Sequence, residues 1–227
     1  EDIELNGTIA EGLFKGAFSI SDDNVVLNFD GEVNTAKEVP FSNFSLIVEK
    51  ANLEKLGLTS LGDSLLQVSF NAICAAKGSN ADNITGDLVL QNINLSNEEY
   101  SFKDGDLALN LSATQKKRNL LLESSYLDLG MEGIIYFSEM IEDWEGWLSN
   151  LFFSEEILLT DKESNYSFKL MVKDFKPIQN TFISDLRIDS STLITGRFNG
   201  ETQKIDIDLA SSFMSYKGFL TKDINLK

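Results

Sequence analysis

The sequence predicts an all-β protein built mainly as one elongated antiparallel sheet, with one longer helix near residues 138–152. Apolar and polar residues alternate with a period of two over most of the 227-residue chain. This period is that of a strand with one apolar and one polar face. Short clusters of Gly, Asn, Asp and Ser separate the alternating segments, and these residues are typical of turns.

The segment Gly12–Val33 shows the pattern most clearly, because two alternating arms meet at the Asp-Asp-Asn sequence of residues 22–24. Phe14 and Phe18 share one face of the first arm, and Leu27 and Phe29 share one face of the second. We therefore expect a hairpin with one apolar and one polar face. Most of the remaining chain repeats this alternation of apolar and polar residues, with variations.

Further strands are expected wherever the alternation resumes after a turn. They cover Phe44–Val48, Leu66–Cys74, Leu88–Leu95, Tyr100–Phe102, Leu107–Leu111, Leu120–Leu122, Leu127–Met131, Phe168–Val172, Leu186–Ile188, Leu193–Phe198, Ile205–Leu209 and Tyr216–Leu220. Within Leu88–Leu95 the apolar phase slips by one residue at positions 91–92, which predicts a β-bulge. Gly105 and residues 116–119 are expected to form turns.

The longest helical pattern is Ser138–Phe152, in which Met140, Trp144 and Trp147 recur at helical spacing. Ser138 is the expected N-cap of this helix. Its acidic face disfavours contact with anionic lipid headgroups, so an interfacial membrane helix is the weaker interpretation. We expect the helix to pack against the sheet and to limit access to the apolar face.

A weak internal repeat suggests two successive units of one sheet, because Phe44–Ala51 matches Phe168–Phe175. A short helical turn follows each copy, at residues 51–58, ended by Gly57, and after Pro177. The expected organisation is a first sheet unit at residues 1–136, a helical insertion at 137–153 and a second sheet unit at 154–227.

Composition excludes several classes of function. The chain contains no histidine, so the common catalytic triads and imidazole metal sites are absent, and we expect neither enzyme activity nor a metal or other cofactor. A net charge of −17 without a basic cluster disfavours nucleic acid as a partner. Cys74, the only cysteine, is in phase with Phe70 and Ala72 and is expected to be a small buried hydrophobe.

No apolar run reaches the roughly 18 residues that a membrane-spanning helix requires. The opening sequence EDIELNGTIA lacks an initiator Met and a signal-peptide core, yet it already follows the strand rhythm. We therefore expect the chain to be a segment of a longer protein.

The apolar face is the remaining candidate site. It is aliphatic and phenylalanine-rich, with few polar residues at inward positions, which suits hydrocarbon better than a polar ligand. Each methylene transferred from water contributes about 0.8 kcal/mol, so a chain of ~15 carbons gains on the order of 10 kcal/mol without a directional contact. Two such sheets facing each other in a closed sandwich explain the same pattern.

The candidate residues that line the apolar face are Phe18, Val25, Leu27, Phe29, Phe44, Leu46, Val48, Leu66, Val68, Phe70, Leu88, Leu90, Leu107, Leu109, Leu111, Phe168, Leu170, Val172, Ile205, Ile207 and Leu209.

Five stretches carry a resemblance to a known family: Ile3–Ile9, Val26–Gly31, Phe44–Leu58, Asn83–Leu88 and Tyr216–Gly218. They resemble the TamB family, and most closely the TamB-like, AsmA-superfamily proteins of Bacteroidetes. The resemblance extends over nearly the whole chain and includes no catalytic signature.

The resemblance implies a periplasm-spanning envelope protein, anchored in the inner membrane by an N-terminal helix outside this sequence. Its body would be a long sheet curled into a half-pipe, a β-taco or repeating β-groove whose apolar lumen conducts phospholipid between the inner and outer membranes. A TamA-type outer-membrane barrel is the implied partner, although the C-terminal domain that engages it is not recognisable here.

Two alternatives remain open. The segment can serve as a scaffold or chaperone that offers a sheet edge to nascent outer-membrane strands. It can also be a closed β-sandwich interaction module.

Overall fold

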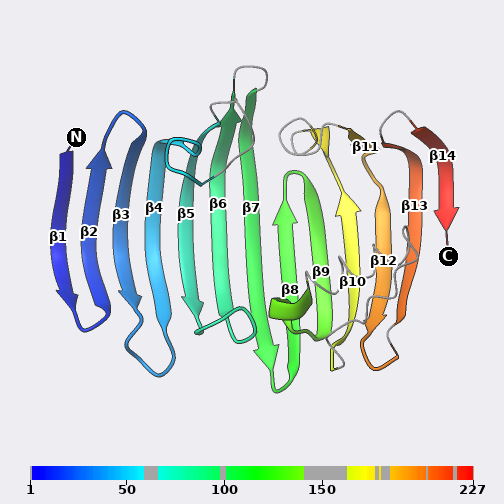
Figure 1. The fold of residues 1–227 in the computed structure, drawn as a ribbon, viewed down its shortest axis with the longest axis horizontal. Helices are drawn as coiled ribbons and strands as arrows, with labels where there is room; N and C mark the ends of the chain where they lie inside the picture. Colours follow the sequence, from blue (N-terminus) through cyan, green and yellow to red (C-terminus); the bar gives the residue numbers. More distant parts are fainter. Residues whose placement is uncertain are drawn as a thin grey trace.

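A computed structural model of the chain describes residues 2–58, 66–97, 101–140, 163–176, 179, 185–202, 204–216 and 219–226. These residues form one open, curved sheet of 14 strands, with the two chain termini at opposite ends of the sheet (Figure 1). The predicted all-β class and the elongated antiparallel sheet are confirmed. No helix in these ranges is long and apolar enough to cross a bilayer.

The strands follow the predicted segments closely. They are β1 (Asp2–Ala10), β2 (Leu13–Ser21), β3 (Val25–Asn34), β4 (Phe41–Asn52), β5 (Gln67–Lys77), β6 (Thr85–Ser96), β7 (Ser101–Thr114), β8 (Lys117–Ser124), β9 (Leu127–Ile134), β10 (Asn165–Val172), β11 (Leu186–Ile188), β12 (Leu193–Asn199), β13 (Lys204–Tyr216) and β14 (Phe219–Leu226).

Sequence neighbours are also sheet neighbours over most of the fold. From β1 to β10 each strand pairs antiparallel with the next, and the order then continues through β12 and β13. Strands β9 and β10 pair directly, so the sheet is continuous across the predicted helical insertion. Strand β14 pairs with one edge of β13, and β12 and the short β11 share the other edge.

The predicted bulge in β6 is confirmed. The pairing of Leu90 with Leu107 is followed by that of Ile93 with Gly105, so β6 carries one extra residue, and Asn92 has a φ of 54°. A second irregularity follows in β7, where Asp104 has a φ of 59°. The two bulges offset each other, and the apolar residues on both sides of them stay on one face.

The expected turn at Gly105 is wrong, because Gly105 lies inside β7 and is buried. A Cβ atom at this position would meet the Tyr126 hydroxyl and the Phe102 ring. The Asp-Gly-Asp sequence therefore marks a bulge under an aromatic pair and not a chain reversal.

The helical turn ended by Gly57 is confirmed, but Ala51 belongs to β4 and not to the turn. The Leu56 N–H donates to the Asn52 carbonyl over 3.1 Å, and the Leu58 N–H donates to the Leu53 carbonyl over 2.8 Å. Gly57 has a φ of 71°, the left-handed conformation with which many helical turns end.

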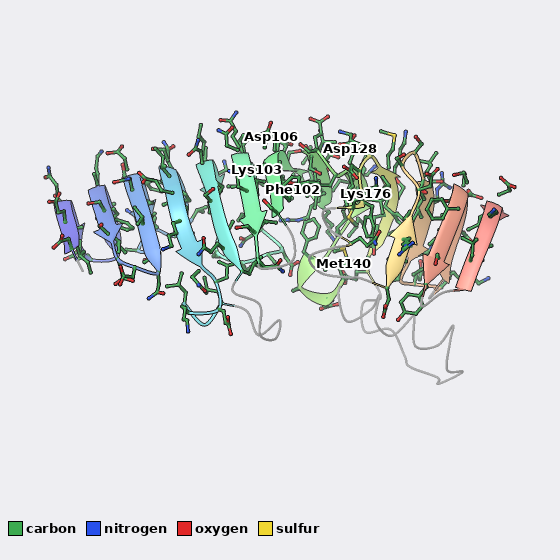
Figure 2. The ribbon with its side chains drawn as sticks, turned by 90° about the horizontal axis from the view of Figure 1, so that it is seen from above. Phe102, Lys103, Asp106, Asp128, Met140 and Lys176 are labelled. Atoms are coloured by element: carbon green, nitrogen blue, oxygen red, sulfur yellow. The ribbon has the colours of Figure 1, made fainter. Side chains whose placement is uncertain are left out.

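Of the predicted helix at 138–152, residues 137–140 are helical and the remainder lies outside the described residues. Most of the turn expected after Pro177 also lies outside them. Figure 2 shows Met140 on the side of the sheet opposite Asp106 and Asp128.

The tightest core lies in the C-terminal half of the sheet. Met131, Ile135, Tyr166, Phe168 and Phe198 form a buried cluster, and the Tyr166 and Phe198 rings stack with their centroids 5.2 Å apart. This cluster gives the C-terminal half a core of its own, although no second sheet is present among the described residues.

We predict that Phe198→Ala lowers the free energy of unfolding by about 3–5 kcal/mol, because the ring is 1% exposed and its removal leaves a cavity. Phe14→Ala removes an equal number of atoms from a half-buried position and should lower it by about 1 kcal/mol. Urea denaturation followed by circular dichroism measures both values. Equal losses for the two variants would contradict a core centred on the C-terminal half.

Candidate functional site

The cross-strand register places the candidate lining residues of the strands on a single face, the apolar face. Residues directly opposite each other in an antiparallel pair project from the same side of a sheet, so chains of paired residues form rows across the strands. One row contains Phe18, Phe29, Leu46, Ala72, Leu90 and Leu107, and another contains Phe44, Cys74, Leu88, Leu109, Leu122, Leu129, Leu170, Ile194 and Leu209.

The other candidates join the same face through their partners. Leu27 pairs with Val48 and Val48 with Phe70, while Val25 pairs with Ala51 and Ala51 with Val68. The remaining pairs are Leu111 with Leu120, Leu120 with Met131, Met131 with Phe168, Val172 with Leu127 and Ile205 with Phe198; Ile207 pairs with Gly196, which pairs with Phe168. Leu66 precedes β5 and is buried, and its carbonyl accepts the Leu53 N–H over 2.9 Å.

Four phenylalanines form an aromatic cluster on the apolar face of β2–β4. Phe18 stacks on Phe29 with ring centroids 4.9 Å apart, and Phe44 and Phe14 lie 5.1 and 5.5 Å from Phe29. Phe29, at the centre of the cluster, is buried. Such contacts contribute about 0.5–1.5 kcal/mol per pair beyond burial and give this surface a fixed shape.

A glycine lies opposite a glycine beside this cluster, because Gly7 pairs with Gly16. A Cβ atom on Gly16 would lie 2.5 Å from the Cα of Gly7, and the φ of Gly16 is 149°. Only glycine fits at this close approach, and the absence of side chains here leaves room beside the rings of Phe14 and Phe18.

The apolar face is open in β1–β7. Its leucines, including Leu27, Leu46, Leu90 and Leu109, are half-buried, and each strand makes its substantial contacts with its sheet neighbours only. Apart from the turn at residues 53–58, no helix or second layer of strands in the described ranges packs on this half of the face (Figure 2). The described strands therefore do not form the closed sandwich considered from the sequence.

The same face is covered in the C-terminal half. Phe137 and Met140 pack against the buried cluster together with Ile205 and Ile207. Phe168 and Val172 are only 7% and 2% exposed. Phe168 and Val172 therefore serve as core. The other C-terminal candidates, Leu170, Ile205, Ile207 and Leu209, stay half-buried, as do most candidates in β2–β7. In the N-terminal half the buried candidates are Phe29, Val48 and Leu66.

Hydrogen bonds to a carboxylate hold residues 137–140, the segment that covers the C-terminal half of the apolar face. Asp82, in the turn between β5 and β6, accepts hydrogen bonds from the backbone N–H and the hydroxyl of Ser138, the former over 3.0 Å. The Arg118 guanidinium donates to the Ala81 carbonyl over 3.3 Å and lies 5.7 Å from the centroid of the Phe137 ring. We call Asp82, Arg118, Phe137 and Ser138 the clamp.

The electrostatics of Asp82 follow from this arrangement. Burial raises its pKa, but hydrogen bonds from Ser138 and from the Phe137 N–H, together with the nearby Arg118 charge, outweigh this effect and hold the pKa below its ordinary value. The sequence predicts Ser138 itself as the N-cap of the helix. In the structure, the carboxylate of Asp82, from another part of the chain, accepts the Ser138 N–H instead. No local sequence signal indicates the contact between Asp82 and Ser138.

Several residues of the apolar face are missing from the sequence-derived set, although the same alternation includes them: Phe14, Ile20, Cys74, Leu120, Leu122, Leu129, Met131 and Ile194. Burial raises the pKa of the Cys74 thiol. Cys74 lies between Phe44 and Leu88 in its row, so it belongs to the apolar face, but it is half-buried and not the buried hydrophobe that the sequence predicts. Within the described ranges, no group of three or more Asp, Glu, Cys or His side chains is placed to hold a metal ion.

Comparison with family models, with curated proteins and with solved structures finds no match for this chain. The resemblance to the TamB family therefore stays a prediction.

We predict that Asp82→Ala accelerates amide hydrogen exchange at Ser138 about fivefold, the effect expected from losing one helix cap. Asp30→Ala, which removes an exposed carboxylate from β3, should leave this exchange rate unchanged. In the unchanged protein the cap is fully effective above the unfolded Asp pKa of about 3.9 and weakens as the pH falls through the lower folded pKa. If Asp82→Ala leaves the amide exchange rate of Ser138 unchanged, the clamp does not position residues 137–140.

Proposed function

We propose that this chain is a segment of a TamB-like envelope protein whose apolar face binds phospholipid acyl chains and conducts them between the inner and outer membranes. The observation that carries the proposal is the continuous set of aliphatic and aromatic rows across β1–β7 without a covering layer in the described ranges. In this proposal the protein acts in the periplasm, has no enzyme activity, and meets a TamA-type barrel through parts outside this segment.

The chemistry of the rows favours hydrocarbon over other ligands. At about 4.8 Å between strands, the rows of β1–β7 extend for roughly 29 Å without interruption. Side chains such as Leu46, Leu90 and Leu107 offer no directional contact that would select one position along a row. An acyl chain held only by non-directional apolar contacts can move along the row, and lipid conduction requires such movement.

The face of the sheet opposite the apolar face is charged, which supports lipid binding on the apolar face alone. It carries Glu4, Lys15, Asp30, Glu32 and Asp87, with an ion pair of 3.2 Å between Lys15 and Glu32. These residues keep the back of the sheet in water. The two faces therefore separate a hydrated side from a side suited to acyl chains.

Strand β1 favours the scaffold function as a second candidate. Among the described strands it forms one edge of the sheet, each of its residues is exposed, and Ile3 is 72% exposed. Such an edge can accept a further strand by backbone pairing. A photocrosslinker at Leu5 that captures an outer-membrane protein, with none captured from Leu109 to lipid, would favour this function over lipid transport.

Native mass spectrometry of the protein purified from bacterial membranes tests the lipid proposal directly. Bound phospholipid that survives gentle ionisation is the expected result. Consistent absence of lipid from the purified protein would contradict it.

We predict that Leu109→Asp reduces the bound lipid signal at least about tenfold, because a charge in the middle of a row breaks the apolar surface. The fold should persist, because Leu109 is half-buried on an open face and the new carboxylate reaches water. Leu121→Asp is the matched control: Leu121 is 42% exposed and lies on the polar face, opposite Asn110.

Circular dichroism and native mass spectra of both variants measure fold and lipid in parallel. Equal lipid loss in Leu109→Asp and Leu121→Asp would contradict binding on the apolar face. Unfolding of Leu109→Asp would indicate instead a closed core over this residue.

A further inference from the structure

A notch opens at one end of the C-terminal half of the sheet. Strand β10 ends at Val172, which is hydrogen-bonded to Ser191 and Thr192, whereas β13 continues to Tyr216 and pairs there with β11. The edge of β11 that faces away from β13 therefore has no β10 residue beside it. Residues 173–176 and β11 border this notch.

A cavity of about 640 Å³ occupies the notch. This volume lies in the range of small-molecule sites, about 300–1,000 Å³. Its apolar lining includes Phe175, Ile188 and Phe213. Arg187 lies opposite Ser215, two residues after Phe213 on β13, so Arg187 and Phe213 project from the same face of the sheet.

The charged lining is balanced. Lys173 donates to Asp128 over 2.6 Å and to the Ser124 carbonyl over 3.0 Å, so its charge is already paired. Lys176 and Arg187 make no ion pair within the described part of the chain, and two carboxylates, Asp174 and Asp189, line the same cavity. The Asp174 carboxylate accepts the Lys176 N–H over 3.2 Å, and the Asp189 carboxylate accepts the Ser212 hydroxyl. The lining thus offers two cations without an ion pair and two carboxylates that each accept one hydrogen bond from the chain.

This balance decides between classes of ligand. A purely anionic group would meet the carboxylates, and a purely cationic group would meet Lys176 and Arg187. A headgroup with a phosphate and an ammonium matches both signs, because guanidinium and ammonium groups bind phosphate and carboxylates bind ammonium. Phe213 and Phe175 add apolar surface beside the charges, as an attached acyl chain requires.

We propose that this cavity is a headgroup site for a zwitterionic phospholipid of the phosphoethanolamine class. Lys176 and Arg187 contact the phosphate, Asp174 and Asp189 contact the ammonium, and the acyl chain continues over Phe213 onto the face that carries Leu209. The inference rests on the proposed lipid-binding function and names the lipid class for one end of the apolar face.

The experiment compares three ligands with the same acyl chain: lysophosphatidylethanolamine, lysophosphatidylglycerol and a monoacylglycerol. Native mass spectrometry of the 227-residue chain measures the bound fraction of each. The phosphoethanolamine lipid should bind roughly fivefold to tenfold more tightly than the other two, the effect expected from charge-assisted contacts at an exposed site.

Variants assign the preference to the cavity. Lys176→Gln combined with Arg187→Gln should reduce binding of the phosphoethanolamine lipid to the monoacylglycerol level and leave the monoacylglycerol unaffected. Asp174→Asn should reduce the ratio between the affinities for lysophosphatidylethanolamine and for lysophosphatidylglycerol. The control, Lys117→Gln with Arg197→Gln, removes two cations that line a different cavity and should preserve the preference.

The outcomes separate the two proposals. Equal binding of all three ligands overturns the headgroup site and leaves the acyl-binding function standing. No binding of any ligand overturns the acyl-binding function itself. Free phosphoethanolamine that binds as tightly as the lipid, or a preference that survives loss of Lys176 and Arg187, also overturns the headgroup site as proposed.

Discussion

The continuity of the apolar face depends on the register of the backbone hydrogen bonds. A slip of one residue in any strand would turn its apolar side chains to the other side. The sheet contains such slips, yet each is a bulge placed so that the rows survive: in β4 between Val48 and Ala51, in β6 at Asn92 and in β7 at Asp104. Backbone pairing thus sets the geometry, and the bulges keep the sequence in phase with it.

The alternation was sufficient to predict the strands and their faces because period two is a local property. The bulge in β6 was predictable for the same reason, since the phase slip at 91–92 is visible in the sequence. Gly105 was misinterpreted because Asp-Gly-Asp is also a turn signal. The bulge at Asn92 on the neighbouring strand β6 offsets the bulge at Asp104, so that β7 continues through Gly105.

The features that sequence reasoning missed are contacts between distant segments. Asp82 and Ser138 are 56 residues apart, and neither belongs to a motif that indicates the other. The cavity beside β11 exists because β10 ends before β13, and the length of a strand relative to a non-adjacent strand has no local signature. The register places the candidate lining residues of the strands on one face, but the division of that face into open and covered parts depends on such contacts.

One surface therefore has two physical roles. In the C-terminal half the rows meet Phe137 and Met140, and burial of Phe168, Tyr166 and Phe198 stabilises the fold. In β1–β7, apart from the turn at residues 53–58, no other described segment covers the same kind of row, and the Phe14–Phe18–Phe29–Phe44 cluster reduces its exposure without closing it.

A sheet that needed the whole face for stability would be covered throughout, since uncovered apolar area forfeits about 25 cal/mol per Å². The buried cluster instead lies in the C-terminal half, and β1–β7 extend the same sheet strand by strand through backbone pairing. In the proposed lipid-binding function, a ligand on the exposed area of β1–β7 leaves the buried cluster of the C-terminal half intact, so the proposal separates the surface for binding from the core that gives stability.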